Sequence, residues 1–112
     1  VSAPFHCELM RSATEKMRRE ISNVEFKKPG INIISNVTAQ ETNDPKEIKK
    51  LLIEQIEKPV RWREIVINMI GSKVDKFIEI GPGKVLSGLV KRINSNVELI
   101  QVNDLEDIGK LN

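Results

Sequence analysis

Residues 76–93 combine a strand, a glycine-rich turn and an amphipathic helix, and this combination constrains the fold more than any other segment. Lys76–Ile80 is short and mostly apolar, which predicts a strand, and it runs directly into the turn Gly81-Pro82-Gly83. Apolar side chains then recur at helical spacing as far as Ile93. A further short strand is predicted at Glu98–Val102. Strands that alternate with helices in this way indicate an α/β fold whose strands are parallel.

The upstream part of the chain continues the alternation. Residues 8–23 predict an amphipathic helix, because apolar side chains recur there every three or four positions. Residues 31–37 are β-branched and mostly apolar, which predicts a buried strand, and the polar residues 38–43 predict a loop. The sequence therefore predicts helices packed on a short, largely parallel sheet of three strands. A sheet that thin is typical of the end of a larger α/β domain.

Two further helices are predicted from their boundary signals. Asp44 is suited to be an N-cap, with Pro45 at the first helical position and Glu47 completing a pair that resembles a capping box. The second of these helices begins near Trp62, and Gly71 is its predicted C-terminal stop.

Charge and cysteine content exclude several classes of protein. The 112 residues include 18 basic and 16 acidic side chains, a net charge of +2, whereas a dedicated nucleic-acid binder normally shows a clear basic excess. No apolar run approaches the roughly 20 residues that span a bilayer, and no signal-peptide pattern is visible. Cys7 is the one cysteine, so neither an intramolecular disulfide nor a thiolate metal cluster can form. We expect no nucleic acid, no membrane and no metal.

His6 is the first candidate for chemistry. It follows Pro4-Phe5 in the loop before the first predicted helix, so it is not placed on a packed helical face. Imidazole titrates near neutral pH, which suits a general base and acid. Taken without context, a lone histidine more often has a surface or structural role, because one titratable group does not define a site.

Three other features have both a structural and a functional interpretation. Gly81-Pro82-Gly83 could cradle a phosphate, but its spacing fits neither the dinucleotide fingerprint nor the phosphate loop, so we expect a tight turn with Gly88 packed closely behind it. Gln55 lies on the apolar face of its helix, where a hydrogen bond to backbone is the ordinary role. Basic side chains could form a patch or a solvated helix face: Lys84, Lys91 and Arg92.

Four segments together resemble the malonyl-CoA:acyl carrier protein transacylases. VSAPFHCELM (residues 1–10) resembles the segment around the catalytic histidine of that family, and ISNVT (residues 34–38) resembles the strand that follows it. Gln55 with PVRW (residues 59–62) is similar to a Gln…Pro-Val-x-Trp segment, and FIEIGPGKVLSGLVKRI (residues 77–93) is similar to the C-terminal block. The four motifs keep the order of the family and cover nearly the whole chain.

The resemblance implies a mechanism. In the family a serine takes malonyl from coenzyme A as an ester, and a second half-reaction passes it to the phosphopantetheine thiol of acyl carrier protein. His6 matches the histidine that deprotonates this serine, and Gln55 matches the residue whose backbone carbonyl orients the imidazole. Phe5 resembles a ring that crowds the branch of methylmalonyl. The implied function is malonyl transfer in fatty-acid biosynthesis, with a coenzyme A thioester as substrate and no cofactor.

Residues 1–112 are accordingly expected to be the C-terminal part of a hydrolase-like acyltransferase subdomain. The resemblance implies that the part bearing the nucleophile and a ferredoxin-like subdomain precede this region; none of the seven serines lies in a Gly-x-Ser-x-Gly elbow. We expect the full-length protein to be a monomeric enzyme of the bacterial cytoplasm and this piece to be inactive alone. Two alternatives are a non-catalytic module that binds a carrier protein through Lys84, Lys91 and Arg92, and a truncated pseudoenzyme.

Overall fold

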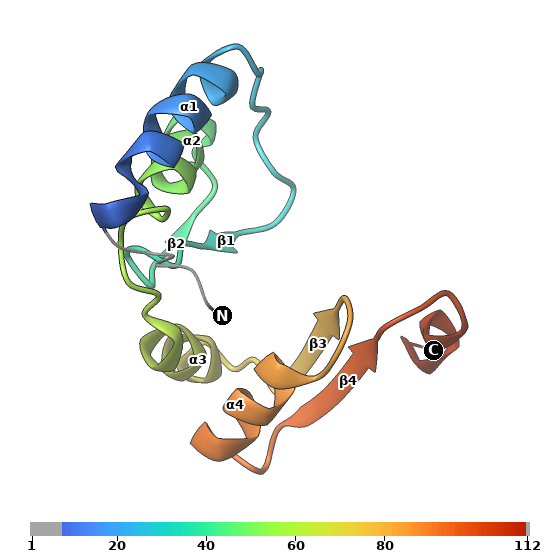
Figure 1. Cartoon of the computed structure of the whole chain (residues 1–112). Coiled ribbons are helices and arrows are strands. Elements are labelled where there is room, and N and C mark those ends of the chain that lie inside the picture. Colours follow the sequence, from blue (N-terminus) through green and yellow to red (C-terminus); the bar gives the residue numbers. More distant parts are fainter. Residues whose placement is uncertain (1–7, 112) are drawn as a thin grey trace. The chain divides into compact units, whose positions relative to one another are not determined.

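The computed structural model describes residues 8–111, which divide into two compact units (Figure 1). Val1–Ile65 forms the first unit and Val66–Asn112 the second. The boundary falls within the helix α3 (Trp62–Gly71). Each unit is described below by itself.

The first unit is built on two helices that pack against each other, α1 (Arg11–Ser22) and α2 (Pro45–Glu54). A 3₁₀ turn, η1 (Glu8–Met10), precedes α1, so the predicted first helix is confirmed with a tightened first turn. Thr14 is buried in α1, and its hydroxyl donates to the Met10 carbonyl at 3.1 Å, which meets the hydrogen-bonding need of a polar group in the core. From α2, the Lys49 ammonium donates to the carbonyls of Ser22 and Val24 and so caps the end of α1.

The predicted strand over residues 31–37 is wrong in length and in pairing. Only β1 (Ile33–Ile34) is extended, and it pairs antiparallel with β2 (Glu41–Thr42) inside the predicted loop. The Ser35 hydroxyl accepts from the Val37 amide at 3.0 Å, and the Ser35 carbonyl accepts from the Ala39 amide at 2.9 Å. These local hydrogen bonds compete with the sheet and turn the chain back on itself, with Ala39 at φ +58°.

The predicted start of α2 is confirmed at Asp44 and Pro45. Asp44 Oδ1 accepts from the Lys46 amide at 3.0 Å, as an N-cap should. The predicted role of Glu47 is wrong: Glu47 Oε2 accepts from the Thr42 hydroxyl at 3.1 Å, and that same hydroxyl accepts from the Asp44 amide at 3.3 Å. The Thr42 hydroxyl therefore links the Glu47 carboxylate to the Asp44 amide, and the direct contact of a capping box is not formed.

The helix α3 ends at Gly71, the predicted stop, but the residue with the left-handed conformation follows two positions later. Gly71 is its last helical residue, and Lys73 takes the left-handed conformation at φ +71°. The Lys73 amide donates to the Ile70 carbonyl and the Val74 amide to the Met69 carbonyl, which is the Schellman pattern. The chain ends this helix with a lysine in a conformation that glycine adopts at lower cost.

The second unit contains a strand–helix–strand arrangement. β3 (Lys76–Ile80) and β4 (Glu98–Val102) coincide with the predicted strands and pair in parallel, with Phe77 opposite Leu99 and Ile80 opposite Val102. α4 (Val85–Ile93) connects them and contacts both, and a 3₁₀ segment, η2 (Glu106–Leu111), packs on β4. Figure 1 shows α4 lying along the strand pair.

The α/β class is confirmed, but the predicted three-stranded sheet is not. Residues 8–111 contain two separate two-stranded sheets, one antiparallel and one parallel. Gly88, predicted to pack closely, is exposed, and a Cβ placed there would meet no described atom within 4 Å. Among the same residues, we find no helix with the length and apolar character needed to cross a bilayer.

Candidate active site

Of the three residues predicted to act in catalysis or substrate selection, the described part of the chain contains one. Phe5 and His6 lie outside the described residues. Gln55 is the C-cap residue of α2, and its amide donates to the Leu51 carbonyl at 3.0 Å. Carbonyls at a helix C-terminus have no acceptor role within the helix and bind donors from elsewhere. The role that the resemblance implies for the Gln55 carbonyl, to orient the His6 imidazole, stays a prediction.

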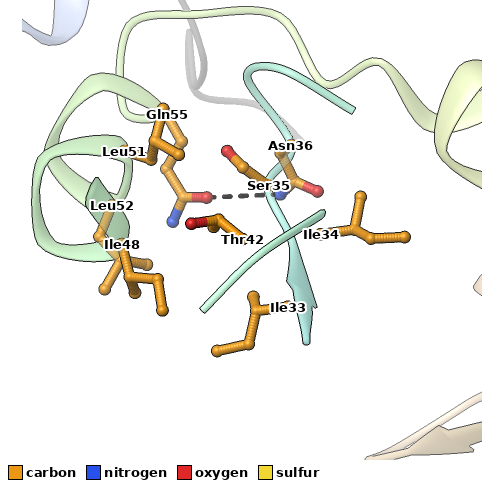
Figure 2. A pocket seen from close by; sticks show the side chains of 9 residues that line it. All are labelled: Ile33, Ile34, Ser35, Asn36, Thr42, Ile48, Leu51, Leu52 and Gln55. Atoms are coloured by element: carbon orange, nitrogen blue, oxygen red, sulfur yellow. Dashed lines mark hydrogen bonds between the residues drawn. The ribbon is translucent and has the colours of Figure 1, made fainter. Parts of the chain in front are cut away.

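Asn36 joins two of the motif segments that are separated in sequence. Its side-chain amide donates to Gln55 Oε1 across 3.5 Å, and its backbone carbonyl accepts from the Arg61 amide at 3.2 Å. Figure 2 shows the Asn36 and Gln55 amide groups facing each other between α2 and the strand segment. The ISNVT segment thus contacts both the end of α2 and the PVRW segment.

Arg61 strengthens this junction. Its Nη1 donates to the Thr38 carbonyl at 3.1 Å, and its Nη2 pairs with the Glu64 carboxylate in the first turn of α3. The hydrogen bond that Arg61 donates to the Glu64 carboxylate raises the pKa of the Arg61 guanidinium above its ordinary value. Arg61 therefore ties the turn after β1 to the start of α3, and this arrangement fixes the backbone around Asn36.

A hollow of about 90 Å³ lies beside Gln55 (Figure 2). Isoleucine and leucine side chains from β1 and α2 form most of its wall, together with the polar groups of Ser35, Asn36, Thr42 and Gln55. Pockets that enclose organic ligands usually measure roughly 300–1,000 Å³. The hollow is therefore too small to hold a coenzyme A thioester, and we assign it no substrate.

The glycine-rich turn is structural, as its spacing predicts. Gly81 and Gly83 have φ values of +131° and +84°, and the Gly81 amide donates to the Val102 carbonyl at 2.9 Å. The place that a phosphate would take at the start of α4 is occupied by a carboxylate of the chain itself. Glu79 accepts from the Leu86 amide at 3.2 Å, from the Ser87 amide at 2.9 Å and from the Ser87 hydroxyl at 2.7 Å.

Glu79 is the residue that the sequence interpretation missed. Its hydrogen bonds from the Ser87 hydroxyl and the Ser87 and Leu86 amides lower its pKa below the ordinary value. The signal was present in the strand pattern, because alternation in β3 places Glu79 on the same face as Phe77, the face that α4 covers. A carboxylate on a covered face requires donors, and the start of the next helix supplies them.

Three basic side chains are exposed at the two ends of α4: Lys84, its N-cap residue, and Lys91 and Arg92. Lys91 and Arg92 lie in the last turn of that helix, where positive charge complements the helix dipole. Residues 8–111 hold no group of three or more His, Cys, Asp or Glu side chains arranged to bind a metal ion. The structure therefore offers exposed basic side chains at the ends of this helix, and their chemistry suits an anionic partner.

The chain was compared with known proteins, and those that it matches are longer than it is. No family model matches the chain. The chain is 46% identical over 108 residues to the malonyl CoA-acyl carrier protein transacylase of Bacillus subtilis, covering 96% of this chain and 34% of that protein. A solved acyl carrier protein S-malonyltransferase from Vibrio cholerae superposes with a TM-score of 0.89 at 43% identity, over 100% of this chain and 37% of the other.

A second solved structure is a malonyl-transacylase in complex with a type II PKS acyl-carrier protein, and it superposes with a TM-score of 0.88 at 35% identity. The match covers 98% of this chain and 36% of the other. In sequence and structure, therefore, the chain is similar to one part of these proteins. The predicted resemblance to malonyl CoA-acyl carrier protein transacylases is confirmed, and the chain spans about a third of the length of these relatives.

Proposed function

We propose that the protein containing this chain transfers malonyl from malonyl-CoA to the phosphopantetheine thiol of acyl carrier protein in fatty-acid biosynthesis. The observation that supports this most is similarity over 96% of the chain to a transacylase. Within the described residues, the ISNVT segment also contacts Gln55 and the PVRW segment. The acceptor is supported by a relative solved with an acyl-carrier protein. We place the reaction in the cytoplasm, because the relatives named above come from bacteria.

In the proposed mechanism, His6 is the general base and acid for a serine outside this chain. The imidazole takes the serine proton as the malonyl ester forms and returns it to the departing coenzyme A thiol. The Gln55 carbonyl holds one ring nitrogen of His6 and leaves the other directed at the serine, and Phe5 restricts branching at the malonyl α-carbon. No cofactor is needed, because the serine ester conserves the energy of the thioester.

The test has a sequence arm and a kinetic arm. The gene product should contain a Gly-His-Ser-x-Gly motif upstream of His6, and its absence would refute the enzyme proposal. In the full-length protein, His6→Ala should reduce malonyl transfer by orders of magnitude, because the serine then lacks its base. Gln55→Ala keeps the backbone carbonyl and should lower transfer only modestly, which separates the role of the carbonyl from that of the side chain.

A second candidate function is carrier-protein binding without catalysis. It is favoured by one observation, the exposure of three basic side chains at the ends of α4: Lys84, Lys91 and Arg92. If the full-length protein binds a carrier protein but forms no malonyl ester, the module or pseudoenzyme alternative holds. If the enzyme proposal is right, K91E/R92E should raise the KM for the carrier protein and leave ester formation from malonyl-CoA unchanged.

A further inference from the structure

The chain leaves the α-helical path just after Gln55, and the backbone hydrogen bonds show how. The Gln55 amide still makes an α-helical bond, to the Leu51 carbonyl at 3.0 Å. The next two amides bond one residue closer, which tightens the turn: Ile56 to the Ile53 carbonyl at 3.3 Å and Glu57 to the Glu54 carbonyl at 3.2 Å. The turns stop before Pro59, which is the fourth residue after Gln55.

Pro59 occupies the position from which a continued helix would reach Gln55. In an α-helix each amide donates to the carbonyl four residues earlier, so residue 59 would donate to the Gln55 carbonyl. Proline has no backbone N–H, and its ring disfavours helical backbone at the preceding residue, Lys58. The sequence therefore removes the amide that a longer helix would direct at the Gln55 carbonyl.

The segment that contains Pro59 is anchored on both sides through Asn36. The Asn36 side-chain amide donates to Gln55 Oε1 across 3.5 Å, and the Asn36 carbonyl accepts from the Arg61 amide at 3.2 Å. Pro59 lies between these two contacts and is exposed. Packing in the core therefore does not account for a proline at this position, whereas the missing amide does act on the backbone of Gln55.

We propose that Pro59 is a positioning residue for malonyl transfer, because it keeps a competing amide away from the carbonyl that orients the His6 imidazole. The inference rests on the proposed function, which supplies the pairing of Gln55 with His6. A backbone amide and an imidazole N–H both donate to a carbonyl, so an amide at residue 59 would compete for it. An imidazole that loses this acceptor also populates its other tautomer, in which the nitrogen directed at the serine carries the proton and cannot act as a base.

The kinetic test is Pro59→Ala in the full-length protein, with Pro29→Ala as the matched control. Both prolines follow a lysine, and both substitutions add a backbone N–H, but Pro29 lies far from Gln55 in the sequence. Pro59→Ala should lower kcat roughly tenfold and leave the KM for malonyl-CoA unchanged, because partial competition costs less than the roughly 10²–10⁴-fold that general base catalysis contributes. Pro29→Ala should leave both constants unchanged.

The tautomer of His6 is the second measurement, because a merely structural effect of the substitution would not change it. The ring ¹⁵N chemical shifts are recorded at a pH where the imidazole is neutral and are assigned with His6→Ala. They should report one tautomer in the unsubstituted protein and in Pro29→Ala, and a mixture of both tautomers in Pro59→Ala.

Each result decides the proposal. Unchanged kcat and tautomer in Pro59→Ala would overturn it, and so would an equal loss of kcat in both variants or a loss of kcat with the single tautomer retained. Circular dichroism checks folding, and Pro59→Gly, which adds the same amide, should act in the same direction if Pro59→Ala does not fold. A full-length protein that forms no malonyl ester would refute the proposed function, whereas the His6 tautomer would still decide the role of Pro59, because it is measured without turnover.

Discussion

Glu79 fixes the start of α4 from the neighbouring strand, and its pKa gives this contact a pH dependence. The pKa is lowered in the folded chain, so the stabilisation is present above the unfolded value, about 4.3, and is lost as pH falls through the folded value. Glu79→Gln should therefore lower the urea midpoint at neutral pH, and the difference from the unsubstituted chain should vanish in acid.

Glu98→Gln is the control for this substitution. Glu98 is exposed and pairs only loosely with Lys76 at 3.8 Å, so its replacement should leave the urea midpoint nearly unchanged at every pH. Asp107, whose pKa is also lowered by its hydrogen bond from Lys110 and by the Asn103 amide, remains in both variants and cancels from the comparison. Equal midpoints for Glu79→Gln and Glu98→Gln at neutral pH would contradict the assigned role of Glu79.

Lys73 ends α3 in a conformation that costs stability. A left-handed residue other than glycine costs about 1–2 kcal/mol, and the greater unfolded-state entropy of glycine offsets about 0.5–1 kcal/mol of the gain from replacing it. Lys73→Gly should therefore raise the free energy of unfolding by about 0.5–1 kcal/mol, measured by urea titration. Lys73→Ala removes the same charge without relieving the strain, and a similar gain from it would contradict the explanation.

The sequence predicted which residues begin a helix better than it predicted which side chains form hydrogen bonds with each other. Asp44 and Pro45 were identified correctly because a helix N-cap depends on local backbone geometry. The partners of Glu47 and Glu79 were not predicted, since Thr42 and Ser87 reach them only after a strand and a helix have been positioned. The roles of His6 and Phe5 come from the resemblance and stay predictions.

At the scale of elements, α2 depends on its N-cap and in turn places Gln55. Asp44→Ala removes the acceptor for the Lys46 amide and should destabilise the chain by about 1 kcal/mol, with a loss of helical circular dichroism. Asp44→Asn keeps an acceptor at the same position and should cost less. If the two substitutions had the same effect, the hydrogen bond to Lys46 would not be what stabilises α2.

Strand prediction succeeded in the second unit and failed in the first for a physical reason. β3 and β4 are bounded by a glycine turn and a helix, and Glu79 in β3 accepts from backbone amides of α4, outside the strand ladder. The segment from residue 31 to 37 looked equally β-branched, but Ser35 captures the Val37 amide and the chain turns after two paired residues. The polar Ser35 inside an apolar run limits the length of this strand, and the hydrophobic pattern alone does not predict that limit.

At the scale of the molecule, several large apolar side chains of the described residues are exposed. Ile78 and Ile80 are exposed on β3, and so are Leu9 in η1 and Met17 in α1, which the helical periodicity predicts to be buried. A fold that corresponds to about a third of its relatives leaves such surfaces when the remaining portion is not present. The motif contacts around Asn36 and Gln55 are nevertheless formed, because both residues lie within the first unit.

The same incompleteness predicts that a polypeptide of these 112 residues has no transferase activity by itself. None of its seven serines lies in a Gly-x-Ser-x-Gly elbow, and a histidine without an activated nucleophile cannot form an acyl-enzyme. Incubation with malonyl-CoA should leave its intact mass unchanged, and transfer to acyl carrier protein should equal the protein-free blank, whereas the full-length Bacillus subtilis relative should be active in the same assay. A malonyl ester on any of the seven serines would contradict the prediction and place the nucleophile within this chain.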